Sequence, residues 1–342
     1  MSKTEIKSFA WPLVGHAKIV KYLQQNLFSD NLAHAFLFSG PSHLGKSTVA
    51  KFFINSLVCR NLHAHTGSVP CGTCECCRQV ANNVHPDMYW LGRIVNEKTG
   101  KLNKNIGIEQ IRQLQNMLSL GSFLNSYKVA VIDEAQALSQ EAANSLLKTL
   151  EEPTPKTIVI LLASSPSLLP RTIISRCQVI KFLPVSTADI FAYLLSLKIE
   201  RKKAKTLAAL ALGRPGLAIN FAATADSFSD FQEEYKSFMA LAAADLVTRF
   251  KIAGEIAAGN DPDELKEILL VWRRALRDLL LIKLAAQNFI SNLPLAADLT
   301  ALAERYSREK IIGLINETNA TRQFLGANVN SKLAIENLII NF

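Results

Sequence analysis

The chain has 342 residues, 49% of them hydrophobic, which is enough for two or three domains with well-buried cores. Its formal net charge of +9 favours polyanionic partners such as nucleic acid, with a basic soluble protein that lacks this role as the alternative. No apolar run reaches the length of a membrane span and the first residues do not resemble a signal peptide, so we expect no membrane association and a cytoplasmic location.

The first motif with chemical content is a phosphate-binding loop. An apolar run at 35–38 predicts a buried strand, a helical run follows at 47–58, and between them stands GPSHLGKS at 40–47. These letters match G-x-x-x-x-G-K-[ST], whose main-chain N–H groups curl around a polyphosphate at a helix N-terminus. Lys46 would reach the β- and γ-phosphates and Ser47 would coordinate Mg²⁺. The predicted nucleotide-binding residues here are Gly40, Gly45, Lys46, Ser47 and Thr48.

Five of the six cysteines fall between residues 59 and 77. In a reducing compartment this clustering favours a metal site over disulfides. Four of these cysteines have a spacing that can converge on one tetrahedral ion, namely Cys59, Cys71, Cys74 and Cys77. Zn²⁺ suits four thiolate ligands, and such a closed site is structural because it leaves no position open to a substrate.

The spacing leaves two choices of metal ligand open. Cys76 could replace Cys77, and either His63 or His65 could replace Cys59. Free thiols on a loop are the alternative to any metal. A bound ion would hold together an insert of about residues 59–80, which has little apolar core of its own.

A second apolar strand, predicted at 128–132 after a shorter one at 88–91, delivers two carboxylates at its end. Asp133 would orient the Mg²⁺ shell and Glu134 would position or polarise the attacking water, with a surface turn as the alternative. Between these strands, lysines at 98, 101 and 104 precede a helix predicted from 106. They could contact a phosphate backbone, or they could form a solvated loop.

Further apolar runs at 157–162 and 178–183 predict two more strands, and their alternation with helices predicts an α/β fold with a mostly parallel sheet. From residue 186 onward the pattern is helical. We therefore expect a nucleotide-binding domain at 1–185, a small helical domain at 186–240 and a second helical domain at 241–342.

Taken together, the motifs resemble the delta-prime subunit family of the bacterial clamp loader. This AAA+ machine opens the sliding clamp and loads it for the replicative DNA polymerase III. The resemblance covers nearly the whole chain. The segments that carry it are HAFLFSGP at 34–41, the cysteine insert, HPD at 85–87, NSLLKTLEEP at 144–153 and SRC at 175–177.

The resemblance implies roles for residues that no local pattern identifies. Arg176 of the SRC tripeptide would be an arginine finger for the ATP site of a neighbouring subunit, with a surface salt bridge as the alternative. Arg214 would be a sensor arginine in a helical lid, or a residue that only packs a turn. Ser164 and Ser165 both fit the polar sensor that follows the strand at 157–162.

The resemblance also implies a P-loop domain with a zinc-binding insert, a lid, and a helical collar that holds a pentameric ring together. The implied cofactors are ATP, Mg²⁺ and Zn²⁺. The implied partners are the gamma/tau and delta subunits of the heteropentamer, the sliding clamp and primed DNA.

Some delta-prime subunits have a degraded phosphate loop and act as a stator, whereas this chain keeps Lys46, Ser47, Asp133 and Glu134. Nucleotide binding is therefore expected, while hydrolysis by its own site is left open and no polymerase chemistry is implied. The alternative is a gamma/tau-like motor ATPase, although the start of this chain reads FAWP instead of carrying the Tyr-Arg-Pro signature of that subunit.

Overall fold

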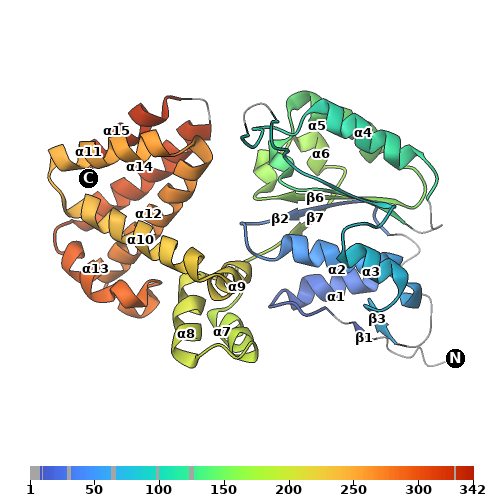
Figure 1. Cartoon of the computed structure of the whole chain (residues 1–342), viewed down its shortest axis with the longest axis horizontal. Coiled ribbons are helices and arrows are strands. Elements are labelled where there is room, and N and C mark those ends of the chain that lie inside the picture. The colour runs from blue at the N-terminus through green and yellow to red at the C-terminus, as the bar shows by residue number, and fades with distance from the viewer. Residues whose placement is uncertain are drawn as a thin grey trace. The chain divides into compact units, whose positions relative to one another are not determined.

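The computed structural model describes residues 8–9, 11–28, 32–62, 67–97, 100–122, 127–326 and 329–342. The chain forms two compact units. The first comprises Met1–Ser186 with Arg214–Gly216, and the second comprises Thr187–Gly213 with Leu217–Phe342. Figure 1 colours residues up to 186 from blue to green and the later residues from yellow-green to red. None of the helices in the described ranges is long and apolar enough to cross a membrane.

A five-stranded parallel sheet, in the order β4-β5-β6-β2-β7, forms the centre of the first unit. Its strands are β2 (Ala35–Ser39), β4 (Met88–Leu91), β5 (Lys128–Ile132), β6 (Thr157–Ala163) and β7 (Gln178–Lys181). Each strand overlaps a segment that the sequence predicted to be extended, and β2 and β6 each run one residue further than predicted, so the predicted α/β fold with a parallel sheet is confirmed. A separate parallel pair joins β1 (Ser8–Phe9) to β3 (Ser68–Val69).

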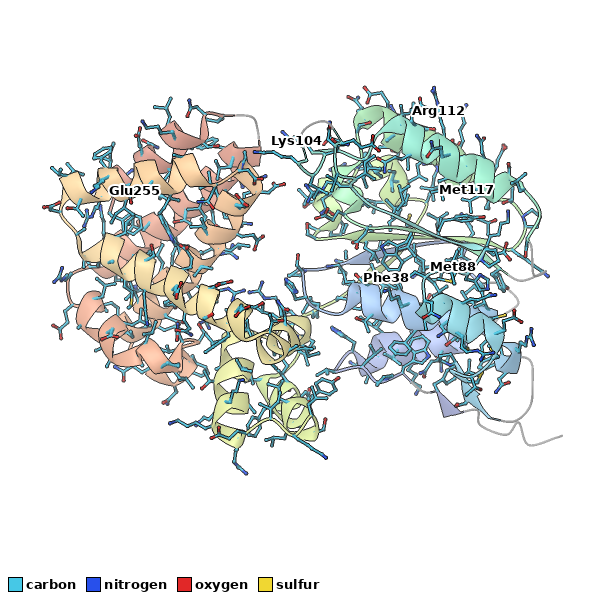
Figure 2. The ribbon with its side chains drawn as sticks, in the orientation of Figure 1. Phe38, Met88, Lys104, Arg112, Met117 and Glu255 are labelled. Atoms are coloured by element: carbon cyan, nitrogen blue, oxygen red, sulfur yellow. The ribbon has the colours of Figure 1, made fainter. Side chains whose placement is uncertain are left out.

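Helices cover both faces of this sheet (Figure 1). One face carries α1 (Ala17–Asn26), α2 (Lys46–Val58) and α3 (Glu75–Ala81), and the other carries α4 (Ile108–Ser119), α5 (Gln140–Glu151) and α6 (Arg171–Ile174). Because successive strand residues point to opposite faces, Phe36 and Phe38 pack on the side of α2, while Leu37 packs on the side of α5 (Figure 2 labels Phe38). A strand buried on both faces must be apolar throughout, which explains the continuous runs in the sequence.

The second unit consists of helices in the part of the chain that the structure describes. They are α7 (Thr187–Ser196), α8 (Arg201–Leu210), α9 (Pro215–Ala223, whose first two residues belong to the first unit), α10 (Ala225–Ala243), α11 (Leu246–Gly259), α12 (Pro262–Lys283), α13 (Ala296–Ala303), α14 (Arg308–Gly326) and α15 (Ser331–Ile340). The fully buried rings of Tyr235, Phe238 and Trp272 lie in the core of this unit. Helix α10 runs without a break through residues 240 and 241, so no loop marks a division there, and the separation into lid and collar stays a prediction.

Candidate nucleotide and metal sites

The phosphate-binding pattern lies where β2 meets α2, as the sequence predicted. Gly40 has φ +149° and Gly45, the N-cap of α2, has φ +90°, a region that favours glycine. At Gly40 there is also no room for a side chain, because a Cβ atom would stand 2.4 Å from the carbonyl oxygen of Phe182. The first turn of α2 therefore directs unpaired N–H groups and the positive end of its dipole into the loop, which makes an anion site.

Lys46 lies back across this loop. Its Nζ donates to the carbonyl oxygens of Gly40, at 2.5 Å, and Pro41, at 2.8 Å. Burial lowers the pKa of the Lys46 ammonium, and the negative charge of Asp133 partly restores it. A phosphate group entering the loop would offer this half-buried cation stronger acceptors than two carbonyl oxygens.

Asp133 and Glu134 follow β5, at the end of the sheet where the parallel strands have their carboxyl ends. Burial raises the pKa of the Asp133 carboxyl, while the hydrogen bond from the Glu134 N–H, at 2.9 Å, and the charge of Lys46 oppose that rise. Parallel strands all have their carboxyl ends at the same end of the sheet. The loop after β2 and the carboxylates after β5 therefore both lie at that end.

The Glu134 carboxylate is held by an arginine that the sequence analysis missed. Arg93, two residues after β4, places its Nε 2.6 Å from one carboxylate oxygen and its second guanidinium nitrogen 3.2 Å from the other. The Arg93 side chain is 16% exposed and that of Glu134 44% exposed. The signal available in the sequence was that charged residues follow both β4 and β5, which are adjacent strands of the sheet.

The structure places the two sensor candidates in different local roles. Ser164 directly follows β6, and its N–H donates to the Gln136 Oε1 at 3.3 Å. The Ser165 hydroxyl instead takes part in a one-turn helix start, where it accepts from the N–H of Ser167 at 3.4 Å. The Ser165 hydroxyl thus has a capping role, and the assignment of either serine as the sensor stays a prediction.

Arg214 belongs to the same compact unit as the phosphate loop. Two residues further on, the N–H of Gly216 donates to the carbonyl oxygen of His43 in that loop at 2.9 Å. A Cβ at Gly216 would stand only 3.0 Å from the same oxygen, so a side chain there would require the loop to shift by a few tenths of an ångström. The predicted lid arginine is therefore next to a segment that lies directly on the phosphate loop.

Arg176 lies between α6 and β7, where its polar contacts are within its own subunit. One guanidinium nitrogen is 2.6 Å from the Glu151 carboxylate, and another donates to the carbonyl oxygen of Thr172 at 2.9 Å. The Arg176 side chain is 34% exposed. The structure of a single chain thus shows the surface salt bridge that the sequence analysis held as the alternative, and the role in trans stays a prediction.

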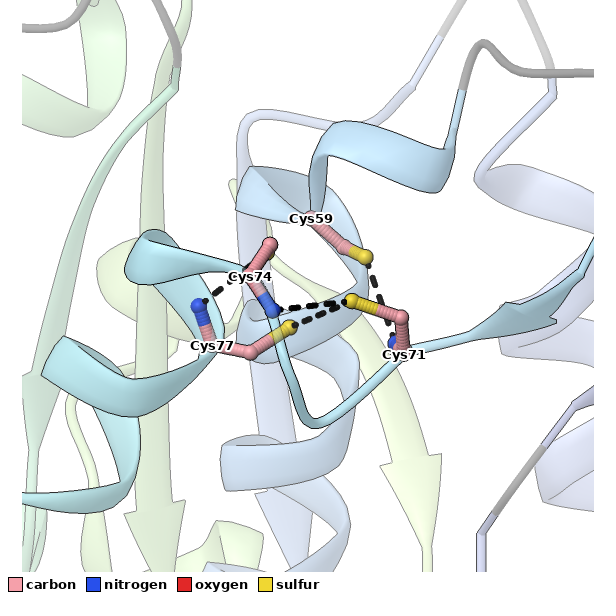
Figure 3. A group of neighbouring side chains, drawn as sticks. All are labelled: Cys59, Cys71, Cys74 and Cys77. Carbon is pink, nitrogen blue, oxygen red and sulfur yellow. Dashed lines mark hydrogen bonds between the residues drawn. The ribbon is translucent and has the colours of Figure 1, made fainter.

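Four cysteines form one compact cluster, which Figure 3 draws. The ligand atoms of Cys59, Cys71, Cys74 and Cys77 all lie within 4.8 Å of one another. Cys76, in contrast, is buried against Val58 and Val80. The structure therefore brings together the set with Cys77 and leaves Cys76 out, while His63 and His65 lie outside the described residues.

The cluster fits a tetrahedral metal. Bonds of about 2.3 Å from Zn²⁺ to sulfur place tetrahedral sulfur atoms roughly 3.8 Å apart, and the Cys71 and Cys77 sulfur atoms are 3.8 Å apart. The main-chain N–H groups of Cys71 and Cys74 point at the sulfur atoms of Cys59 and Cys71, each at 3.3 Å, as they would toward thiolates. Burial raises the pKa of Cys59 and Cys77, so these thiols need a nearby cation to ionise.

Of the lysines that precede α4, Lys98 lies outside the described residues, whereas Lys101 and Lys104 are exposed (Figure 2 labels Lys104).

Two family models match this chain. One, described as "DNA polymerase III, delta subunit", matches residues 15–186, and the other, "DNA polymerase III, delta subunit, C terminal", matches residues 230–342. Among curated relatives, the tau subunit of DNA polymerase III from Bacillus subtilis is 28% identical over 91% of this chain and 57% of its own length. The delta-prime subunit from Haemophilus influenzae is 34% identical over 56% of each chain.

This chain therefore spans somewhat more than half the length of those curated relatives. Among solved structures, a gamma-subunit-related protein from Thermotoga maritima superposes with a TM-score of 0.46 at 15% identity, over 94% of this chain and 97% of that one.

Proposed function

The chain belongs to the delta-type subunit family of DNA polymerase III, whose members include the delta-prime subunits of the clamp loader, and from this premise we propose that it acts as a delta-prime-like ring subunit. In this role it binds ATP at its own phosphate loop and supplies Arg176 to the ATP site of a neighbour. The observation that carries the proposal is the match of both family models to a chain whose phosphate loop is built and whose Asp133 and Glu134 lie at the same sheet edge.

The partners we propose are the gamma/tau and delta subunits, the sliding clamp and primed DNA. The test of assembly is to mix the full chain with separately purified gamma/tau and delta subunits and to measure complex formation by size-exclusion chromatography with light scattering. We expect one stable ring that loads the sliding clamp onto primed DNA only when this chain is present. A mixture in which this chain elutes alone would refute the proposal.

Nucleotide binding rests on Lys46, Ser47 and Asp133. The Lys46 ammonium would exchange the carbonyl oxygens of Gly40 and Pro41 for phosphate oxygens. Ser47, in the first turn of α2, and the carboxylate of Asp133 are the oxygen donors that would hold Mg²⁺, which when bound neutralises phosphate charge. Arg214 would supply a further cation to the site, because it lies two residues before Gly216, whose N–H bonds to the phosphate loop at His43.

Replacing Lys46 with alanine is expected to weaken ATP binding by roughly 10- to 100-fold, because a charge-assisted contact to phosphate is lost. Fluorescence anisotropy with a labelled ATP analogue measures this change in the isolated chain. Lys51→Ala is the matched control, since it removes a lysine from the same helix beyond the phosphate loop. Unchanged affinity in the Lys46 variant would show that this loop does not hold the nucleotide.

A gamma/tau-like motor is the second candidate, favoured by the intact loop and by the tau relative that matches 91% of this chain. The Lys46 variant separates the two roles in the reconstituted ring. A delta-prime-like subunit lets clamp loading and ATP turnover continue when Lys46 is replaced. If Lys46→Ala alone stops turnover by the ring, the motor role is correct.

The ion pair between Arg93 and Glu134 bears on hydrolysis at this chain's own site. A carboxylate that accepts two hydrogen bonds from a guanidinium is not free to polarise water, so this arrangement favours binding over turnover. Arg93→Ala is expected to raise turnover by this site about threefold, because releasing a partly exposed ion pair is worth roughly 0.6 kcal/mol. Steady-state hydrolysis measures the effect in a ring whose motor subunits carry inactivated phosphate loops.

The control is Arg112→Ala, which breaks an exposed pair with Glu109 at 2.7 Å on α4. It should leave turnover unchanged. A fall in turnover with Arg93→Ala would mean that Arg93 orients Glu134 for catalysis instead of restraining it.

The four-cysteine cluster is proposed to bind Zn²⁺ as a structural ion. It offers four thiolate ligands and no open position, so its part is to fix the segment between α2 and β4.

A further inference from the structure

The hairpin of α7 and α8, in the second unit, contains a hollow that the nucleotide site does not use (Figure 1 shows the two helices side by side). Its volume is about 370 Å³, enough for one or two side chains of a ligand. It is lined by Thr187, Ala188, Phe191, Arg201, Lys205 and Ala208.

The surface of the hollow is almost wholly apolar, so Arg201 and Lys205 line it with their aliphatic stems and carry their charges at its rim. Phe191 is half-buried, and Ala208 is fully buried. Arg201 and Lys205 are both exposed and stand four residues apart on α8, so their side chains follow the same face of that helix. The hollow therefore has the composition of a recognition site, where apolar contact is joined to a few charged groups.

Neither Arg201 nor Lys205 forms an ion pair with a carboxylate within the described part of the chain. The Arg201 guanidinium lies instead over the Phe191 ring, 5.9 Å from its centre. The first turn of α7, at Thr187 and Ala188, adds the positive end of a helix dipole, and the Asp189 carboxylate in the same turn offsets part of that positive charge. The positive potential at the hollow thus stays available to an anionic ligand.

The surrounding surface has the same sign. Residues 197–205 carry five cations and one carboxylate, at Lys198, Glu200, Arg201, Lys202, Lys203 and Lys205. An incoming acidic group would therefore be attracted before contact and would find its counter-charges at the rim of the hollow.

We propose that this hollow is a docking site for an acidic peptide segment of a partner protein. A leucine or phenylalanine of the segment would enter between Phe191 and Ala208, and flanking carboxylates would pair with Arg201 and Lys205. An arginine that already covers a face of Phe191 leaves less of the ring for a nucleic acid base to stack on, while its outer N–H groups still bind a carboxylate. This site is separate from the nucleotide loop and does not depend on the proposed function.

The test uses the full chain and a short fluorescein-labelled peptide in which glutamates flank one leucine and one phenylalanine. Anisotropy titration is expected to show saturable binding that is weakened more than about tenfold in the double variant Arg201→Ala, Lys205→Ala. The control is Lys202→Ala, Lys203→Ala, which removes the same charge from the same helix but from residues outside the lining. It should change binding less than about twofold, apart from the general effect of net charge.

Two further probes decide between occupants. A peptide with serine in place of its leucine and phenylalanine should bind much more weakly, because it cannot fill the hollow. An oligodeoxynucleotide of the same net charge should not displace the acidic peptide. The proposal would be overturned if the peptide showed no saturable binding, or if both double variants lost affinity equally. It would also be overturned if the serine peptide bound as tightly as the original peptide, or if the oligonucleotide displaced the peptide. Circular dichroism melting confirms that each variant is folded.

Discussion

Replacing Arg176 with alanine is expected to slow ATP hydrolysis by the reconstituted ring by about 10³-fold or more at the site that receives this residue, the magnitude typical of an arginine finger. The physical reason is that a guanidinium stabilises the charge that develops on the transferred phosphate group. Single-turnover hydrolysis, measured with ATP bound before mixing, separates this effect from any change in nucleotide affinity.

The structure supplies reasons why the Arg176 variant should remain folded. Its ion pair with Glu151 joins side chains that are 34% and 48% exposed, and an exposed pair of this kind contributes at most about 1 kcal/mol. In the role that we propose, so weak a pair would permit the Arg176 guanidinium to exchange Glu151 for a neighbour's nucleotide.

Two variants test the Arg176 prediction from opposite sides. Arg176→Lys should not restore turnover, because a lysine lacks the planar fork of the guanidinium. Arg171→Ala, which removes an exposed arginine from the short helix α6 that precedes Arg176, should leave turnover unchanged. If the Arg176→Ala ring hydrolyses ATP within about twofold of the original ring, Arg176 is only a surface residue.

Removal of the metal is the second change with a large expected effect. Cys71→Ser should abolish stoichiometric zinc, unfold the segment that follows α2 and lower the free energy of unfolding by several kcal/mol. The reason is that structural zinc supplies apparent binding energies of about 10–16 kcal/mol in small zinc peptides, and here the ion would neutralise thiolates that are otherwise buried without a cation. Atomic absorption gives the metal content, and hydrogen exchange over residues 67–97 gives the local stability.

Cys76→Ser is the matched control for the metal prediction. Cys76 is adjacent to a ligand, yet it packs against Val58 and Val80, so its replacement should keep one zinc per chain and cost only about 1 kcal/mol of packing. A purified protein that is folded, free of metal and unchanged by Cys71→Ser would contradict the zinc proposal. Loss of zinc in the Cys76 variant would instead mean that the ligand set was assigned wrongly.

The sequence alone was sufficient for features that arise from neighbouring residues. The sheet strands could be recognised because a strand covered on both faces must be apolar almost throughout, as at 129–132 and 158–163. The phosphate loop could be recognised because its positive φ angles and the close approach of Phe182 require glycine at fixed positions, here Gly40 and Gly45.

Only the tertiary structure decided how distant residues pair. Cys76 and Cys77 are equivalent by spacing, but successive residues of α3 point in directions about 100° apart, so only Cys77 faces the cluster. The contact between Arg93 and Glu134 spans 41 positions and depends on the register that sets Leu91 opposite Ile132. The sequence therefore determined where strands and turns form and which residue types are present as candidate ligands. The packing of the whole core sets the register of the strands and the direction in which each helix faces. These two features of the tertiary structure determined which charged groups and sulfur atoms meet.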